Sequence, residues 1–368
     1  MNLAPQVGYS WSSEPFLARI EEDFSSEGFR WRNLDGAASE GGSMRLQASD
    51  RAGLEVTVTR ELEYLRAGDI LRLSPARGQL RVLYRRHSPH NFLFFTERCN
   101  SRCLMCSQPP REIDDSYLVE DILRAIPHMS PDTRALGITG GEPTLLGQRL
   151  VDVLASAKRH LPNTAIHVLS NGRLLSDLAL AQKIGAVGHP DLMIGVPLYA
   201  DTADIHDFVV QARGAYAETL VGIMNLARAG VRIELRMVIH RETFARLVPF
   251  ARFVARNLPF VDQVVFMGLE ITGFAKTNLE ALWIDPIDYQ DQLESAVALV
   301  DDAGIRACVY NHQLCILRPS LHRFSVRSIS DWKNIYLEAC EKCSAKQMCG
   351  GLFASGLIRH SKYLKAFG

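Results

Sequence analysis

The sequence has no excess of charge of either sign, because its 41 basic residues are balanced by 41 acidic ones. A neutral chain lacks the long-range attraction for phosphates that nucleic acids and anionic membranes exploit. The sequence also lacks any uninterrupted apolar run near the roughly 18 residues of a membrane helix. Its start, MNLAPQVGYSWSSEPFL, has no basic residues followed by an apolar core, unlike a secretory signal. We therefore expect a cytoplasmic protein that binds neither nucleic acid nor membrane.

Internal repeats and low-complexity tracts are absent as well. Short alternating segments such as GLEVTVTREL and QLRVLYRRH are typical of β-strands, so residues 1–90 predict a small β-rich N-terminal module. From residue 91 onward, six mainly apolar segments alternate with six segments of helical periodicity. The predicted strands cover 91–96, 134–139, 165–170, 191–199, 232–239 and 262–269, and the predicted helices cover 116–126, 147–160, 174–186, 215–229, 243–257 and 286–303.

This alternation predicts an α/β fold. Nearly all-apolar strands that alternate with helices are typical of a parallel sheet with both faces covered. We predict that residues 91–304 form a partial (β/α)6 barrel similar to a TIM barrel, with an open doubly wound sheet as the alternative. In both architectures the loops after the strands form the active face. Residues 305–311 can add one more strand, and we expect residues 305–368 to form a cysteine-rich C-terminal module.

The eight cysteines fall into two groups, which does not suit a disulfide framework in a chain of 368 residues. Cys99, Cys103 and Cys106 follow the first predicted barrel strand with C-x3-C-x2-C spacing. A zinc site would need a fourth, distant ligand such as His90 or His128. Three thiolates instead suit a [4Fe–4S] cluster with one iron free of protein ligands. Such an iron can bind a substrate or a cofactor.

Polar residues at the ends of later strands predict a ligand site on the same face. The second barrel strand ends in Gly140-Gly141-Glu142-Pro143, where glycines allow close backbone approach and Glu142 offers an acceptor for an ammonium group. The third strand ends in Ser170-Asn171-Gly172. Arg236 lies inside the fifth predicted strand. A buried charge needs a partner, which is either a ligand carboxylate or a structural salt bridge.

The cysteine spacing and the GGEP motif together resemble the radical S-adenosylmethionine (SAM) superfamily. The resemblance implies a catalytic [4Fe–4S] cluster, held by Cys99, Cys103 and Cys106, whose open iron is chelated by the amino and carboxylate groups of SAM. It implies contacts with SAM from Gly140, Gly141, Glu142 and Pro143 at the amino group, from Ser170 and Asn171 near the ribose, and from Arg236 at the carboxylate. In this superfamily an electron donor such as a flavodoxin or ferredoxin drives reductive cleavage of SAM to a 5′-deoxyadenosyl radical.

One position departs from that superfamily. The fourth predicted barrel strand ends in Pro197-Leu198-Tyr199-Ala200-Asp201, where many relatives carry Ser-Leu-Asp-Gly. The serine that contacts the ribose in relatives is therefore missing. Tyr199 and Asp201 are the candidates to replace it.

The second group of cysteines can close a metal site by itself. Cys315, Cys340, Cys343 and Cys349 supply four thiolates, which suit zinc. C-terminal cysteine sets in radical SAM proteins instead imply an auxiliary [4Fe–4S] cluster, which we favour here. Cys308 lies in an apolar run, and we predict that it is a buried hydrophobic residue and not a ligand.

Longer segments of the sequence resemble one particular group within the radical SAM superfamily. TERCNSRCLMCSQPPREIDD, VFMGLEITGFAKTN, YNHQLCILRPS and CEKCSAKQMCGGLF resemble the radical SAM maturases of the His-Xaa-Ser repeat peptide system. This implies a ribosomally made precursor peptide with His-Xaa-Ser repeats, modified post-translationally by this enzyme, and a second radical SAM protein as partner. The alternatives are a radical SAM enzyme for a small molecule or nucleotide, and a non-catalytic zinc or iron–sulfur scaffold or electron carrier.

Overall fold

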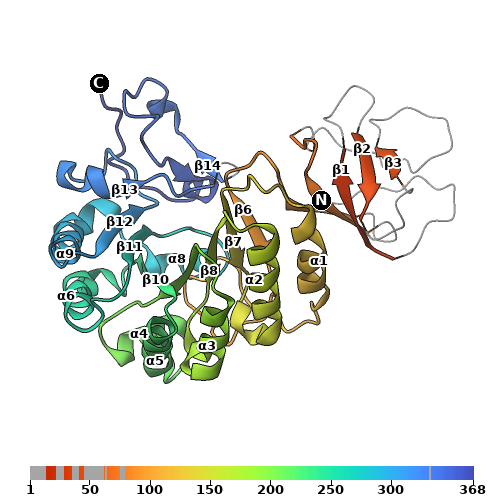
Figure 1. Ribbon diagram of the computed structural model, residues 1–368. Coiled ribbons are helices and arrows are strands. Elements are labelled where there is room, and N and C mark those ends of the chain that lie inside the picture. The colour runs from red at the N-terminus through yellow and green to blue at the C-terminus, as the bar shows by residue number, and fades with distance from the viewer. Residues whose placement is uncertain are drawn as a thin grey trace.

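The computed structural model describes residues 14–21, 29–34, 41–44, 62, 64–74, 79–330 and 333–368. Within them the chain forms a small antiparallel sheet, a large curled parallel sheet with helices on its outside, and a C-terminal tail with little regular structure (Figure 1). The segment GLEVTVTREL, predicted as a strand, lies outside the described residues except for Leu62.

The small sheet has the strand order β3-β2-β1-β4-β5, and its pairs are antiparallel. Its strands are β1 (Phe16–Ile20), β2 (Phe29–Asn33), β3 (Gly41–Met44), β4 (Ile70–Ser74) and β5 (Gln79–Tyr84). Its apolar residues form a core of their own, in which the rings of Phe16 and Trp31 lie 5.2 Å apart. An ion pair between Arg72 on β4 and buried Asp121 joins this sheet to the first helix of the large sheet.

The large sheet curls into a partial barrel, which confirms the predicted fold class. Its eight described strands are parallel and have the order β13-β12-β11-β10-β9-β8-β7-β6. They are β6 (Asn91–Phe94), β7 (Ala135–Thr139), β8 (Ala165–Leu169), β9 (Leu192–Pro197), β10 (Arg232–Ile239), β11 (Gln263–Gly268), β12 (Arg306–Tyr310) and β13 (Ser325–Val326). The helices α1 (Tyr117–Ala125), α2 (Gln148–His160), α3 (Leu178–Val187), α5 (Ala215–Arg228), α6 (Leu247–Asn257) and α9 (Gln290–Asp302) cover its outer face (Figure 1).

The predicted barrel strands and helices are all present, within a few residues of their expected bounds. Strand β12 is the additional strand expected over 305–311. Strand β13 and helix α4 (Ala203–Val210) were not predicted; α4 lies in a stretch that shows little helical pattern. None of the helices in the described part of the chain is long and apolar enough to cross a membrane.

The two faces of the barrel strands differ in polarity. On β10, Leu235 and Met237 are fully buried in the main core under the outer helices. Glu234 and Arg236 alternate with them, so they face the inside of the barrel. Apolar contact with the helices thus holds the sheet in place, and the concave side is left for polar groups.

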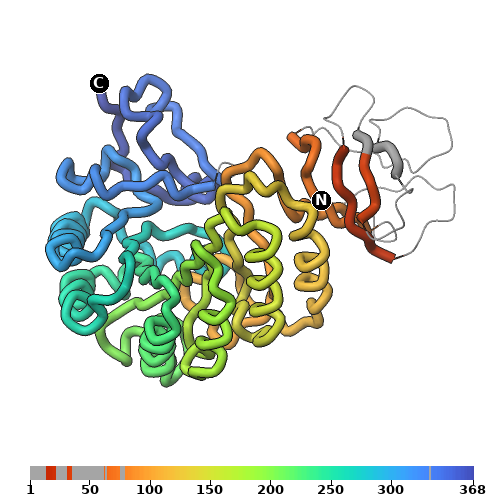
Figure 2. The backbone as a smooth tube through the Cα atoms, viewed as in Figure 1, coloured from red at the N-terminus to blue at the C-terminus, as the bar shows by residue number. Residues whose placement is uncertain are grey.

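The C-terminal tail lies along the end of the barrel at which the strands terminate. It contains the short antiparallel pair β14 (Asn334–Ile335) and β15 (Leu352–Phe353). Figure 2 shows the tail reaching the loop that follows β6, and an ion pair of 3.0 Å joins Lys333 of the tail to Glu270 after β11. The two cysteine groups therefore lie at the same end of the molecule.

Candidate active site

The first three cysteines lie on the cysteine loop, residues 95–112, which follows β6. This loop has no helix or strand of its own, so its shape depends on bonds to neighbouring elements. At its start, the buried carboxylate of Asp115 accepts hydrogen bonds from Thr96 Oγ1 at 3.0 Å and from the Glu97 amide at 2.5 Å. Asp115 therefore fixes the direction in which the loop leaves the strand.

Two other elements hold the far side of the cysteine loop. The Leu104 amide donates to the Val209 carbonyl of α4 at 2.9 Å. The Cys106 carbonyl accepts from the Phe274 amide at 2.8 Å, and a Cβ on Gly273 would lie 2.4 Å from that same oxygen. The unpredicted helix α4 and the segment after β11 thus both contribute to positioning the thiols.

The GGEP motif packs directly on the cysteine loop. The Gly141 amide donates to the Thr96 carbonyl at 2.6 Å. A Cβ on Gly141 would lie 2.0 Å from the Arg98 carbonyl oxygen and 3.2 Å from Cys99 Cβ. Gly140 has φ of +145°, and a Cβ there would lie 2.6 Å from the Thr96 oxygen. Only glycines allow the end of β7 and the loop to approach this closely.

Glu142 follows these glycines with a fully buried carboxylate. Its Oε1 accepts hydrogen bonds from the Thr144 amide at 2.9 Å, from Thr144 Oγ1 at 2.5 Å and from Ser170 Oγ at 2.7 Å. Its Oε2 accepts from the Asn171 amide at 2.6 Å. Burial raises the pKa of Glu142, and these hydrogen bonds act against the rise. Because a carboxylate oxygen has about two acceptor sites, Oε2 retains capacity for one further donor.

The Ser-Asn-Gly motif after β8 also contacts the cysteine loop. Asn171 Nδ2 donates to Asn100 Oδ1 at 2.6 Å and lies 3.9 Å from Cys99 Sγ. Arg173 donates to the Asn100 carbonyl and, through Nε, to Glu218 on α5 at 2.6 Å. The structure thus brings together three motifs that are far apart in the sequence.

The thiols of the loop lie in partly buried surroundings. Burial raises the pKa of Cys103 to about 12, and the nearby Cys106 and Cys99 add to the rise. Burial likewise raises the pKa of Cys99 to about 11. The Cys106 thiol donates to the Gln108 carbonyl at 3.0 Å. Iron must therefore displace protons from these thiols when it binds, because the thiolate is the ligand.

Arg236 is not part of this group of contacts. Its guanidinium donates to Glu234 on the same strand, and Glu234 also accepts from Gln263 and lies 3.3 Å from His167 Nε2. Burial disfavours the charged form of Glu234, but the bond to His167 and the charge of Arg236 outweigh burial and lower the pKa to about 2. The structural salt bridge is formed, and a contact between Arg236 and SAM stays a prediction.

Of the two candidates after β9, Tyr199 lies beside the cysteine loop. It is buried in one apolar cluster with Met105 and Cys103, and burial raises the pKa of its phenol well above the ordinary value. Asp201 instead accepts two hydrogen bonds from Arg246, at 2.8 and 2.5 Å. Tyr199 is therefore the residue after this strand that can reach a group bound at the loop.

Two residues that position the loop were missed by the sequence analysis. Asp115 follows a run of polar residues, and Arg173 follows a glycine in a predicted loop. Neither stands in a pattern that distinguishes it from an ordinary surface residue. The partners of Asp115 lie at the start of the same connection, whereas the partner of Arg173 on the cysteine loop becomes its neighbour only after β6, β7 and β8 have paired.

The four tail cysteines also come together. One small pocket is lined by Cys315, Cys340, Cys343 and Cys349. The amides of Gly351 and Phe367 point at Cys349 Sγ and Cys343 Sγ, at 3.5 and 3.3 Å. Hydrogen bonds to sulfur are a feature of iron–sulfur sites. Cys308 is 3% exposed on β12 and does not line this pocket, which confirms its predicted burial.

Neither cysteine group is arranged around a single ion. Within the part of the chain that the structure describes, no three Cys, His, Asp or Glu side chains are close enough together to hold one metal ion.

Comparison with known families identifies the central part of the chain. Residues 93–254 match the Radical SAM superfamily. This segment is a radical SAM domain. The match begins in β6 and ends in α6, so it includes the cysteine loop, the GGEP motif and the Ser-Asn-Gly motif.

Characterised proteins with related sequences resemble the chain over part of their length. The chain is 25% identical over 218 residues to molybdenum cofactor biosynthesis protein 1 of Drosophila melanogaster, which covers 57% of this chain and 36% of that protein. It is 30% identical over 171 residues to GTP 3′,8-cyclase 2 of Mycobacterium tuberculosis, which covers 44% of each. The chain therefore spans less than half the length of these relatives.

Among solved structures, the chain resembles native anSMEcpe with bound AdoMet and Cp18Cys peptide. The TM-score is 0.51 at 13% identity, and the likeness covers 75% of this chain and 91% of that chain. At this level of identity the likeness concerns the fold, and it extends beyond the segment that matches the family.

The residues of the radical SAM domain fit the two groups that the superfamily implies, a [4Fe–4S] cluster and SAM. Three thiols on one loop are the donors that such a cluster needs. The free acceptor capacity of Glu142 Oε2 suits the ammonium group of an amino acid.

Proposed function

We propose that the chain is a radical SAM enzyme that modifies a ribosomally made peptide of the His-Xaa-Ser repeat type. Cys99, Cys103 and Cys106 would hold the [4Fe–4S] cluster at which SAM binds. When bound, the cluster and SAM supply a one-electron cleavage that yields the 5′-deoxyadenosyl radical, which removes a hydrogen atom from the substrate.

One observation carries this proposal: the ends of β7 and β8 fold onto the cysteine loop. A metal-binding scaffold or electron carrier needs only its ligands. Here Gly141 and Asn171 contact the loop next to Cys99, and they bring the buried carboxylate of Glu142 with them. A fixed carboxylate beside an open iron suits an amino-acid ligand, which the SAM methionine group provides.

The chain's own residues would orient SAM and exclude water. The Ser170 and Thr144 hydroxyls fix the Glu142 carboxylate before any ligand arrives, so little orientation is lost when the ammonium group binds. Tyr199 covers the loop from the side of β9, where its ring packs 5.8 Å from that of His206. These groups bind and position the cofactor and transfer no proton themselves.

The four tail cysteines would hold the auxiliary [4Fe–4S] cluster, with zinc as the alternative. The two backbone amides that point at Cys343 and Cys349 support thiolate ligation of a metal centre there. With all four thiolates used by the cluster, the substrate would not bind to it directly. Its use would then be electron transfer or bracing of the tail.

A peptide substrate is supported by an open groove beside the cysteine loop. The groove has a volume of about 630 Å³, and it is lined by loop residues 107–109 on one side and tail residues 353–355 on the other. Two ion pairs line it, Glu97 with Arg111 at 3.1 Å and Glu270 with Lys333 at 3.0 Å. An open polar groove suits an extended chain, and the related fold of anSMEcpe accommodates a bound peptide.

Anaerobic reconstitution tests the proposal. We expect about eight irons per chain and a reduced electron paramagnetic resonance (EPR) signal that changes when SAM is added. A synthetic His-Xaa-Ser repeat peptide should then change mass with SAM and reductant. Iron without any response to SAM would contradict the proposal, and zinc alone would favour a metal-binding scaffold.

A nucleotide substrate is the second candidate, because GTP 3′,8-cyclase 2 is 30% identical to part of the chain. The groove argues against a triphosphate, since its two acidic and two basic side chains leave no net positive charge. Incubation with GTP in place of the peptide separates the candidates. Consumption of GTP with SAM cleavage would favour the nucleotide.

A further inference from the structure

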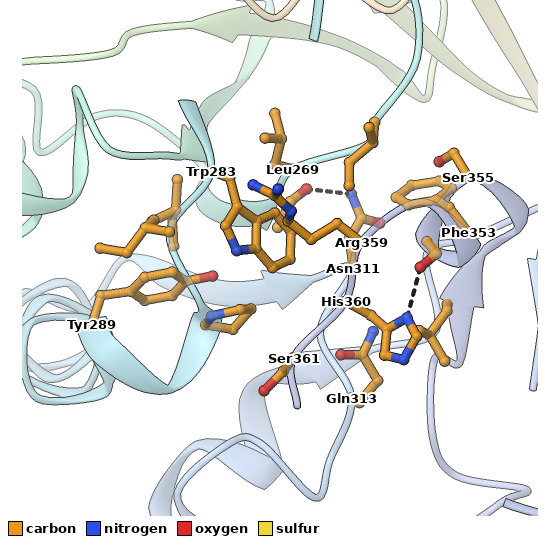
Figure 3. A pocket seen from close by; sticks show the side chains of 17 residues that line it. Leu269, Trp283, Tyr289, Asn311, Gln313, Phe353, Ser355, Arg359, His360 and Ser361 are labelled. Atoms are coloured by element: carbon orange, nitrogen blue, oxygen red, sulfur yellow. Dashed lines mark hydrogen bonds between the residues drawn. The ribbon is translucent and has the colours of Figure 1, made fainter. Parts of the chain in front are cut away.

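A second pocket lies next to the groove, between the barrel strands and the tail. We call it the Trp283 pocket, after the residue in the middle of Figure 3. Its barrel wall carries Trp283 and Tyr289, and its tail wall carries Phe353, Ser355 and His360 (Figure 3). Its volume is about 50 Å³, which corresponds to roughly four water positions. It is therefore the size of one side chain.

The Trp283 pocket lies between the two cysteine groups. Phe353 and Ser355 line both this pocket and the groove beside the cysteine loop. Gln313 and Leu352 line both this pocket and the pocket of the four tail cysteines. A substrate chain in the groove can therefore place one side chain in the Trp283 pocket, on the path from one cysteine group to the other.

The lining selects against positive charge. Of the 17 described residues around the pocket, none is Asp or Glu. Arg359 and His360 both line it, and the Arg359 guanidinium donates at 2.7 Å to Glu280, whose side chain is 81% exposed and outside the lining. A cationic side chain would lose its hydration here without gaining a counter-charge.

The aromatic side chains and amides of the lining suit a flat group. Tyr289 is 1% exposed, and its hydroxyl is 2.8 Å from His312 Nε2. Asn311 has φ of +62°, and its side chain is held by Ser328 Oγ at 2.8 Å and by the Gly268 carbonyl at 3.3 Å. Asparagine tolerates this left-handed conformation, and the two hydrogen bonds fix its side chain after β12, so this part of the lining is preorganised.

We propose that the Trp283 pocket receives one planar side chain of the substrate that carries no positive charge, an aromatic ring or a neutral imidazole. Its occupation sets which substrate residue lies opposite the cysteine loop. The proposal rests on the proposed function, since it assumes a polypeptide in the groove. It adds the chemical class of the side chain that is recognised.

Binding of three blocked amino acids to the reconstituted holoenzyme with SAM tests this proposal. The probes are the N-acetyl methylamides of tyrosine, histidine and lysine at about pH 8, followed by saturation-transfer NMR. We expect the tyrosine and histidine probes to bind at least about fivefold more tightly than the lysine probe. Arg359→Glu should reverse the order, because it places a carboxylate in the lining. Arg359→Gln removes the charge without introducing a carboxylate, so it should perturb the structure less than Arg359→Glu. It should reduce the preference for the tyrosine and histidine probes over the lysine probe.

Arg323→Glu is the matched control, because Arg323 also forms an exposed ion pair, with Asp301 at 2.8 Å, but does not line the pocket. It should leave the order of the probes unchanged. Equal binding of the three probes, no binding of any, or an order that Arg359→Glu does not alter would overturn the proposal. The EPR response to SAM, recorded on the same samples, separates these results from failure of the proposed function. Selective binding of the probes without an EPR response to SAM would contradict the proposed radical SAM activity and would still support the proposed specificity of the Trp283 pocket.

Discussion

At the scale of single residues, the candidate active site depends on glycines, which leave room for a close backbone contact. Gly141 has no room for a Cβ, because the Arg98 carbonyl would be 2.0 Å away. The glycine therefore determines how closely the carboxylate of Glu142 approaches the cysteines. A position of this kind is sensitive to the smallest substitution.

We expect Gly141→Ala to push the cysteine loop away from β7, at a cost of about 1–3 kcal/mol for an overpacked contact. The reconstituted variant should lose the EPR signal that responds to SAM and keep the signal of the tail. Gly147→Ala is a control for backbone strain alone: no atom lies within 4 Å of its added Cβ, but φ of +49° with ψ of −115° costs alanine about 1–3 kcal/mol, so it should lower stability and keep the SAM response. An unchanged SAM response in Gly141→Ala would contradict this role.

Buried histidines make the stability of the chain depend on pH. His240 is fully buried at the end of β10, and burial lowers its pKa to about 3. In the unfolded chain its pKa is about 6.5. Below that pH the unfolded state therefore binds a proton at His240 that the native state does not bind. The unfolding free energy is therefore unaffected by His240 above the pKa of the unfolded chain. It decreases as the pH falls from that pKa toward the pKa of the folded chain.

We therefore expect the unfolding free energy to decrease by about 2 kcal/mol, because of His240, when the pH is lowered from about 7 to about 5. Urea unfolding at the two pH values measures this loss. His240→Leu removes the titrating group, so its unfolding free energy should change less over the same interval. An identical pH dependence in the variant would show that other groups control acid stability.

At the scale of elements, the outer helix α5 supports the candidate active site by packing against the motif that follows β8. Helix α5 approaches the Ser-Asn-Gly motif at Gly222, where a Cβ would lie 2.1 Å from the Gly172 carbonyl. Thr219 on the same helix donates to the Asn171 carbonyl at 3.1 Å. The helix thus supports the motif from behind.

Gly222→Ala sets two effects against each other. Alanine favours the helix by about 1 kcal/mol, but contact with a backbone oxygen cannot be relieved by rotating a side chain and costs about 1–3 kcal/mol. We expect a net loss, seen as a lower thermal midpoint. Val221→Ala, at an exposed position of the same helix, should leave the midpoint nearly unchanged. A more stable Gly222→Ala would show that α5 can shift freely.

At the scale of the whole molecule, the tail brings a second cysteine group to the end of the barrel where the first one lies. The Cys343 sulfur accepts from the Phe367 amide at 3.3 Å, and Ser344 Oγ donates to the Gly368 carbonyl at 2.9 Å. The last residues of the described chain are thereby tied to the cysteine site. Loss of its metal should loosen the tail and leave the barrel intact.

Cys343→Ala should therefore lower the iron content of the reconstituted protein by about half. The EPR change on addition of SAM should remain, because Cys99, Cys103 and Cys106 are untouched. Cys308→Ala is the matched control, since Cys308 is a buried cysteine outside both groups. Loss of the SAM response in Cys343→Ala would mean that the two cysteine groups form one site.

The sequence by itself determined the order of barrel strands and helices, because each element carries its own period of apolar residues. It also determined the cysteine loop and the GGEP motif, since their residues are neighbours along the chain. Tertiary structure decided what these residues touch. Arg236 pairs with Glu234 on its own strand, and Glu142 is enclosed by Ser170 and Asn171 from the next one. Helix α4 and the Trp283 pocket depend on contacts between distant segments, which leave no period in the sequence.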